Sequence, residues 1–228
     1  MASALPVTPV VEVFPSAGYA DAAAARIVDR LPSGGSLVLT GGSTAQAVYR
    51  RIEVPTLGAG PADVLFSDER CVPPDDERSN FRMARGLLER FSAVRVYRMQ
   101  GEDPPAQEEL RYSEVIRPVA DTGFDLVLLG MGGDAHVCAL FPGSDALEED
   151  ELLCRAVERP DGLRGLTLTP PAIARARRVL LLVTGRTKAE AVRRVLRGDE
   201  PIESCPARVV TALPDVTFLL DEGAGALL

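Results

Sequence analysis

The chain has 228 residues, of which 46% are hydrophobic and 25% charged, and its formal net charge at pH 7 is −8. These values are ordinary for a globular protein and exclude disorder as a description of the whole chain. Binders of nucleic acid or of anionic membranes are expected to be basic. The acidic balance, the 5% aromatic content and the absence of tryptophan therefore disfavour both partners.

Length, hydropathy and cysteine spacing further limit the kinds of protein that this chain can be. The length is within reach of one α/β domain, so we expect a single domain over residues 1–228. No apolar run approaches the roughly 20 residues of a membrane helix. No basic segment precedes an apolar core after Met1, so we expect no signal peptide and a cytoplasmic protein. The four cysteines form no CxxC pair, which disfavours a zinc site and a disulfide scaffold.

Apolar, β-branched runs alternate with helix-favouring segments along the chain. Strands are predicted at residues 10–13, 36–40, 64–67, 94–97, 124–129, 152–157, 178–183 and 216–220. Helices are predicted at residues 16–31, 44–52, 79–91, 104–119, 187–196 and 206–213. Ser16 and Ser79 are expected to cap two of them and Gly198 to close another. Loops are predicted at 54–61 and 71–78.

This alternation predicts an α/β fold with a parallel or mostly parallel sheet that helices cover on both faces. The nearly continuous apolar strands FDLVLL (124–129) and RVLLLV (178–183) fit a sheet that is buried on both sides. In open α/β sheets the functional site lies beyond the carboxyl ends of the strands. The polar clusters that follow the predicted strands are therefore the candidates for chemistry.

Two such clusters suggest anion binding. Residues 40–44 (TGGST) follow a strand and open a helix; paired glycines allow close approach of the backbone to a ligand, and the helix offers free N–H groups. A phosphate cradle and a plain strand-to-helix turn explain this segment about equally. It matches neither a Walker loop nor GxGxxG, so nucleotide binding is not indicated. Residues 67–70 (SDER) place two carboxylates and a guanidinium after the next strand, where the residues alone favour a surface ion pair.

Two further clusters suggest a base and a cation. Residues 130–136 (GMGGDAH) contain His136, the only histidine, which is either a general base or an ordinary core or surface residue. Residues 184–189 (TGRTKA) place Lys188 in a first helical turn, where the helix dipole disfavours a cation unless an anion is bound. An exposed lysine is the simpler explanation of that residue. Each cluster alone is a weak signal, but four strand ends that bring such groups to one edge of the sheet together indicate an active site.

Taken in this order, the motifs resemble those of the 6-phosphogluconolactonase family over nearly the whole chain. The motifs are LTGGST at 39–44, SDERCVPPDDERSN at 67–80, FDLVLLGMGGDAHVCALFPG at 124–143, TGRTKAEAV at 184–192 and PARVV at 206–210. The resemblance implies a Rossmann-like three-layer α/β/α sandwich related to the sugar-phosphate isomerases and deaminases. It also implies hydrolysis of 6-phospho-D-glucono-1,5-lactone to 6-phospho-D-gluconate in the oxidative pentose phosphate pathway, without metal or organic cofactor.

The resemblance assigns roles to individual residues. His136 is expected to be the catalytic base, positioned by Asp134, with Arg70 as a further catalytic residue that also holds the phosphate. Asp68 and Glu69 are expected to be structural or site-shaping members of the SDER motif. The substrate-binding residues are expected to be Gly41, Gly42, Ser43, Thr44, Asp68, Gly132 and Lys188. The expected partner is a phosphorylated sugar lactone, and the expected assembly is a monomer or a weak homodimer.

The sequence departs from the family pattern beside the histidine. The family usually has Asp-Gly-His followed by Thr-Ala-Ser, whereas here Ala135 replaces the glycine and residues 137–139 are Val-Cys-Ala. If that position needs a positive φ, the alanine costs about 1 kcal/mol. The catalytic histidine itself is retained.

Three other functions compete with the lactonase. A glucosamine-6-phosphate isomerase or deaminase would share the fold, but Arg70 and the Leu-Phe-Pro run at 140–142 favour the lactonase. A non-catalytic sugar-phosphate sensor would bind without turnover, and the sequence has no recognisable output module. A cysteine enzyme would use Cys138 beside His136, although the spacing of two residues does not readily turn both side chains to one side.

Overall fold

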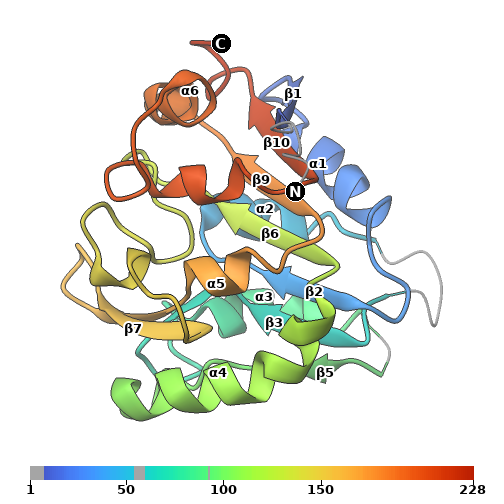
Figure 1. Cartoon of the computed structure of the whole chain (residues 1–228). Helices are drawn as coiled ribbons and strands as arrows, with labels where there is room; N and C mark the ends of the chain where they lie inside the picture. Colours follow the sequence, from blue (N-terminus) through green and yellow to red (C-terminus); the bar gives the residue numbers. More distant parts are fainter. Residues whose placement is uncertain (1–7, 54–59, 92) are drawn as a thin grey trace, which may run out of the picture.

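The larger of two β-sheets forms the centre of the molecule (Figure 1). The computed structural model describes residues 8–53, 60–91 and 93–228. The seven strands of the sheet lie in the order β1-β10-β9-β6-β2-β3-β5 and pair in parallel. Their bounds are β1 (Val10–Phe14), β2 (Ser36–Leu39), β3 (Asp63–Phe66), β5 (Arg95–Val96), β6 (Leu126–Gly130), β9 (Val179–Val183) and β10 (Val216–Asp221).

Helices and a second, smaller sheet cover the two faces of the large sheet. One face carries α1 (Tyr19–Val28), α2 (Ser43–Tyr49) and α3 (Asn80–Leu88); the other carries α4 (Pro105–Thr122), α5 (Pro170–Ile173) and α6 (Ala189–Arg197). A hydrophobic core lies on each face of the large sheet, and strand residues alternate between the two. On β6, Leu126 and Leu128 pack into the core on the face of α1, α2 and α3. Val127 and Leu129 pack into the core on the face of α4, α5 and α6. The predicted α/β/α sandwich with a mostly parallel sheet is confirmed.

The smaller sheet was not predicted. It consists of β4 (Asp68–Arg70), β8 (Arg164–Leu168) and β7 (Cys154–Glu158), which pair antiparallel in that order. The sequence analysis predicted a strand at 152–157, close to β7, but no strand that would pair with it. Residues 68–70 were predicted as the start of a loop. Figure 1 shows β7 beside α4, on the face of the large sheet opposite α1.

Most of the predicted boundaries hold within two or three residues. The α3 cap is confirmed, because the Ser79 hydroxyl accepts a hydrogen bond from the N–H of Arg82, and Gly198 lies at the end of α6. The predicted cap of α1 is wrong: Gly18 occupies that position, and the Ser16 hydroxyl donates to Asp221 instead. The segment 206–213 contains only the 3₁₀ turn η3 (Pro206–Val210), and 3₁₀ turns also form η1 (Asp145–Leu147) and η2 (Arg186–Lys188).

The strand order determines where the site lies. The strands β9, β6, β2 and β3 are consecutive neighbours in the parallel sheet, so their carboxyl ends open onto one edge. Most of the loop predicted at 54–61 lies outside the described residues. In the parts of the chain that the structure describes, no helix combines the length and apolarity needed to cross a membrane.

Candidate active site

A pocket of about 260 Å³ lies at this edge of the large sheet. All of the predicted site residues except Asp134 line it, and Asp134 is hydrogen-bonded to one that does. The lining residues are Thr40, Gly41, Gly42, Ser43, Thr44, Ala45, Asp68, Arg70, Gly130, Met131, Gly132, His136, Cys138, Arg159, Leu182, Thr184 and Lys188. The four strand ends singled out in the sequence therefore meet in one place.

The glycine pair after β2 lets the loop pack closely against α3. A Cβ on Gly41 would lie 2.0 Å from Oδ1 of Asn80, so only glycine allows this approach. Gly42 has a φ of 96°, a left-handed value that glycine adopts without strain. At the start of α2 the Thr44 hydroxyl lies 2.8 Å from that of Thr184, which ties the loop to the end of β9. Ser43 and Thr44 consequently form one wall of the pocket.

Arg70 is fixed by its neighbours at the pocket wall. Its Nη1 donates to Oδ1 of Asn80 at 2.7 Å and to the carbonyl oxygen of Arg78 at 2.8 Å. Asn80 is held in turn, because its Nδ2 donates to the backbone oxygen and the carboxylate of Asp68. The Arg70 Nε is buried and has no partner among the described residues. Asp68 thus supports the guanidinium through Asn80 besides lining the pocket.

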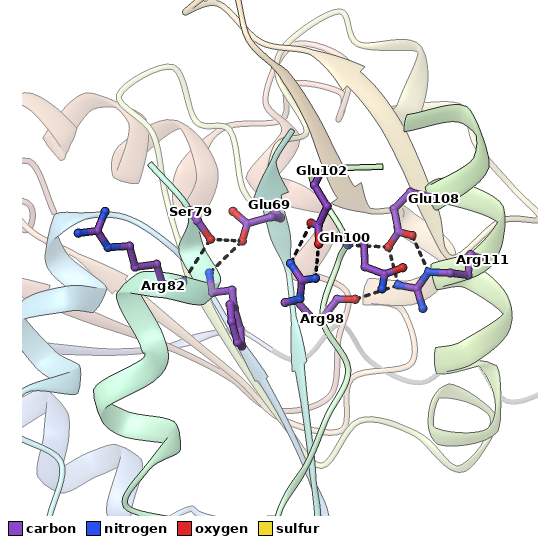
Figure 2. A network of polar contacts seen from close by, with 9 residues as sticks. Glu69, Ser79, Arg82, Arg98, Gln100, Glu102, Glu108 and Arg111 are labelled. Carbon is purple, nitrogen blue, oxygen red and sulfur yellow. Dashed lines mark hydrogen bonds and ion pairs between the residues drawn. The ribbon is translucent and has the colours of Figure 1, made fainter. Parts of the chain in front are cut away.

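Glu69 ties β4 to the beginning of α3 (Figure 2). Its carboxylate accepts hydrogen bonds from the backbone N–H groups of Arg70, Asn80 and Phe81, at 2.7–2.9 Å, and from the Ser79 hydroxyl at 2.9 Å. Burial raises the pKa of Glu69, and these four donors oppose that effect. The side chain is only 3% exposed and does not line the pocket, so its place is structural, as the sequence indicated.

Replacing Glu69 by alanine is expected to destabilise the protein by about 3 kcal/mol or more, because buried N–H groups lose their acceptor at about 1–3 kcal/mol each. For a chain of this size that corresponds to a fall of about 6–12 °C in the unfolding temperature. Glu77→Ala is the matched control, since Glu77 is exposed on the loop that leads to α3. Equal unfolding temperatures for the two variants in calorimetry would refute the structural role of Glu69.

His136 and Asp134 form a hydrogen-bonded pair at the end of β6. Nδ1 of His136 lies 2.7 Å from Oδ1 of Asp134, which also accepts from the His136 backbone N–H at 3.2 Å. This hydrogen bond lowers the pKa of Asp134 to about 2, so the carboxylate is ionised at neutral pH. An ionised carboxylate only accepts, which places the proton of a neutral imidazole on Nδ1. Nε2 is then left with its lone pair and can take a proton.

The backbone of Ala135, which lies between Asp134 and His136, is strained. Ala135 has a φ of 68°, which confirms that the position usually held by glycine requires a positive φ. The strain is of order 1 kcal/mol. The turn is held nonetheless, because the Ala135 N–H donates to the oxygen of Gly132 and its own oxygen accepts from the N–H of Ala207. The sequence departure therefore keeps the geometry that presents His136.

Cys138 also has a positive φ, 54°, and lines the same pocket as His136. The prediction that the two side chains do not readily face each other assumed a strand or a helix; the positive φ shows a turn at Cys138 instead, and both residues line one pocket. Burial raises the pKa of the Cys138 thiol well above its ordinary range. The thiol is neutral at physiological pH, and a neutral thiol is a poor nucleophile.

Lys188 enters the pocket from the turn that follows β9. It ends η2 and precedes α6, close to its predicted place in a first helical turn. Asp221 at the end of β10 fixes this turn by accepting from the N–H of Gly185 at 2.9 Å. Neither Lys188 nor Arg70 forms an ion pair within the described residues. Two uncompensated cations in one pocket favour an anionic ligand.

Three lining residues with polar side chains were not among the predicted site residues: Thr40, which begins the noted TGGST segment, Thr184 and Arg159. Thr184 belongs to a motif that was noted, but its contact with Thr44 depends on the order β9-β6-β2 in the large sheet, which brings the chain after β9 near the start of α2. Arg159 follows β7 and reaches the pocket from the small sheet, and nothing in the sequence signalled it. Lys188 was predicted, and the sequence holds one more signal for it. It is the only lysine in a chain whose other basic side chains are arginines and one histidine. Among the described residues, no three His, Cys, Asp or Glu side chains gather as a metal site.

A comparison with protein families accounts for this arrangement. The family described as "Glucosamine-6-phosphate isomerases/6-phosphogluconolactonase" matches residues 16–218. The chain belongs to this family. The resemblance inferred from the motifs is thereby confirmed.

Individual members of the family match over nearly the full chain. The 6-phosphogluconolactonase of Mycobacterium tuberculosis is 33% identical over 96% of this chain and 98% of its own length. The solved structure of 6-phosphogluconolactonase from Trypanosoma cruzi has a TM-score of 0.85 and 28% identity, covering 98% of both chains. A monomeric glucosamine-6-phosphate deaminase, with a TM-score of 0.81 over 96% of this chain and 100% of its own, is 24% identical and shows the shared fold alone.

Proposed function

We propose that this chain hydrolyses 6-phospho-D-glucono-1,5-lactone to 6-phospho-D-gluconate. The observation that carries the proposal is the His136–Asp134 pair in a pocket that also holds the uncompensated cations Arg70 and Lys188. A base and an anion-binding wall are what hydrolysis of a phosphorylated lactone requires. The named relatives confirm the coarser prediction that the chain is a lactonase-type enzyme.

In the proposed mechanism, His136 acts first as a base and then as an acid. Nε2 takes a proton from a water molecule as the water oxygen bonds to the lactone carbonyl carbon. The tetrahedral intermediate collapses by breaking the bond between that carbon and the ring oxygen, and His136 returns the proton to this oxygen. Asp134 keeps the imidazole in the tautomer that leaves Nε2 free. Arg70, which lines the same pocket, is proposed to steady the developing oxyanion or to hold the phosphate.

The phosphate is proposed to lie against Lys188 and the glycine loop. Its charge of nearly −2 approaches a chain whose own net charge is −8, so long-range attraction is unfavourable and local cations must supply the binding. Gly41, Gly42, Ser43 and Thr44 offer backbone N–H groups and hydroxyls on the same wall. Anchoring the phosphate end orients the lactone toward His136.

Lys188→Ala is expected to raise KM by about 10- to 100-fold and to leave kcat within a few-fold, because a hydrogen bond to a charged group contributes about 1.5–3 kcal/mol. Raising the salt concentration should also raise the wild-type KM by screening this attraction. Arg186→Ala, an exposed cation of the same turn, is the control. A fall in kcat with KM unchanged would move Lys188 to the reacting end of the substrate.

The sole lysine allows an independent check. An amine-directed reagent can modify only Lys188 and the chain's amino terminus. Modification should lower the activity measured at substrate concentrations below KM, and 6-phosphogluconate should protect against this loss. Inactivation that proceeds equally fast with and without 6-phosphogluconate would contradict the binding role.

Turnover of the lactone tests the function itself. The lactone is generated in place from glucose 6-phosphate by glucose-6-phosphate dehydrogenase, and its loss at neutral pH is followed with and without the protein. Loss faster than the spontaneous rate supports the proposal. If the protein leaves the lactone loss at the spontaneous rate and releases ammonia from glucosamine 6-phosphate, the chain is a deaminase and not a lactonase. Binding of 6-phosphogluconate without any turnover would indicate a sensor.

A further inference from the structure

A third cation lies in the wall of the pocket. Arg159 follows β7 on the turn to β8, far in sequence from Arg70 and Lys188, and lines the pocket together with them. Its side chain is only 11% exposed. Burying a guanidinium is unfavourable unless its donors are satisfied, so this placement needs an explanation.

The small sheet holds the Arg159 side chain in one place. Nε and Nη2 donate to the carboxylate of Asp161 at 3.1–3.3 Å, and the backbone N–H donates to the oxygen of Leu163 at 2.9 Å. The guanidinium lies 5.5 Å from the centre of the Phe141 ring, a cation–π contact. That ring also packs against His136, with ring centres 4.6 Å apart.

The neighbouring strand leaves room for this side chain. A Cβ on Gly165 of β8 would lie 3.0 Å from Cδ and 3.3 Å from Cγ of Arg159. Gly165 pairs with Arg70 of β4 on one side and with Val157 of β7 on the other, so the two arginines approach the pocket from the two strands that flank β8. The small sheet therefore presents two guanidinium groups to the pocket, and the turn after β9 presents the lysine.

Arg159 retains hydrogen-bonding capacity after these contacts. Asp161 occupies Nε and Nη2, while Nη1 has no hydrogen-bond partner among the described residues. The Asp161 side chain is 49% exposed, so water screens its charge more than that of the buried guanidinium. The free donor suits a ligand oxygen that carries a permanent negative charge. In a phosphorylated lactone, the phosphate provides such oxygens and the uncharged lactone ring does not.

We infer that Arg159 binds the phosphate of the substrate together with Lys188, and that it determines the preference for phosphorylated over unphosphorylated lactones. The inference rests on the proposed function and adds a residue that the sequence motifs do not contain. Arg159 acts on binding, not on the transfer of protons. Its removal should consequently affect only substrates that carry the phosphate.

The test compares Arg159→Ala with Arg164→Ala on two substrates. Arg164 is 51% exposed on the same hairpin and does not line the pocket, so it controls for loss of charge. For 6-phosphogluconolactone, Arg159→Ala should raise KM by about 10- to 100-fold with kcat within a few-fold. For glucono-1,5-lactone, kcat/KM should equal that of the wild type. Arg159→Lys should recover part of the affinity, because it keeps the charge.

Two results would overturn the inference. An equal loss of kcat/KM on both lactones would place Arg159 at the reacting end or give it a purely structural role. A KM equal to that of Arg164→Ala would show that it does not bind substrate. Calorimetric titration with 6-phosphogluconate separates this inference from the function: if the wild type turns over no lactone, the proposed function fails, and weaker binding by Arg159→Ala still supports the phosphate contact.

Discussion

His136→Asn and His136→Ala are expected to lower kcat by about 10²–10⁴-fold, the range that a positioned general base contributes. The fold should be unaffected, because the His136 side chain is 31% exposed and, among the described residues, hydrogen-bonds only to Asp134 on the same turn. The measurement is the coupled lactone assay with both variants beside the wild type. Thermal unfolding confirms that the variants are folded.

If either His136 variant has a kcat close to that of the wild type, His136 is not the general base. Cys138→Ala is the companion variant, since Cys138 lines the same pocket and is the nucleophile of the competing cysteine mechanism. It should retain kcat within a few-fold, because burial keeps the thiol neutral.

Because the pKa of Asp134 is about 2, this carboxylate stays ionised between pH 4 and 7, and any loss of activity in that range comes from another group.

The large sheet was predictable because its central strands are buried on both faces. The strands β6 and β9 consist almost entirely of apolar residues, the pattern of a parallel strand that is covered on both sides. The small sheet gave no such signal. Its strand β4 is only the three polar residues Asp68–Arg70, and β8 interrupts its apolar pattern with Gly165. Tertiary pairing, of β8 with β7 and of β4 with β8, makes these segments strands, not local propensity.

The site was predictable to the extent that it follows strand ends of the large sheet. His136, Arg70 and Lys188 each come shortly after a buried strand, so the topology alone brings them to one edge. Arg159 was not predictable in this way, because its position depends on the unpredicted small sheet and on space left by Gly165. The roles of all these residues, the single domain, the cytoplasmic location and the monomeric or weakly dimeric state stay predictions.

Gly132→Ala is expected to reduce kcat by about 10²-fold or more, approaching the loss caused by removing the base itself. An added Cβ would lie 2.1 Å from Nδ1 of His136 and 2.2 Å from Oδ1 of Asp134, between the two atoms that form the hydrogen bond. The pair has to separate, and the imidazole then loses both its orientation and its preferred tautomer. Binding of 6-phosphogluconate through Lys188 should weaken less than kcat falls.

Gly133→Ala is the matched control, because a Cβ there would have only ordinary contacts, 3.5 Å from the oxygen of Thr187 and 4.0 Å from Cδ of Lys188. Nitrogen NMR reads the cause directly, since His136 is the only histidine in the chain. The wild type and Gly133→Ala should show the tautomer with the proton on Nδ1, and Gly132→Ala should lose this preference. If Gly132→Ala lost activity while keeping that tautomer, the His136–Asp134 bond would not be what catalysis depends on, and the effect of Gly132 would lie in how the lactone fits the pocket.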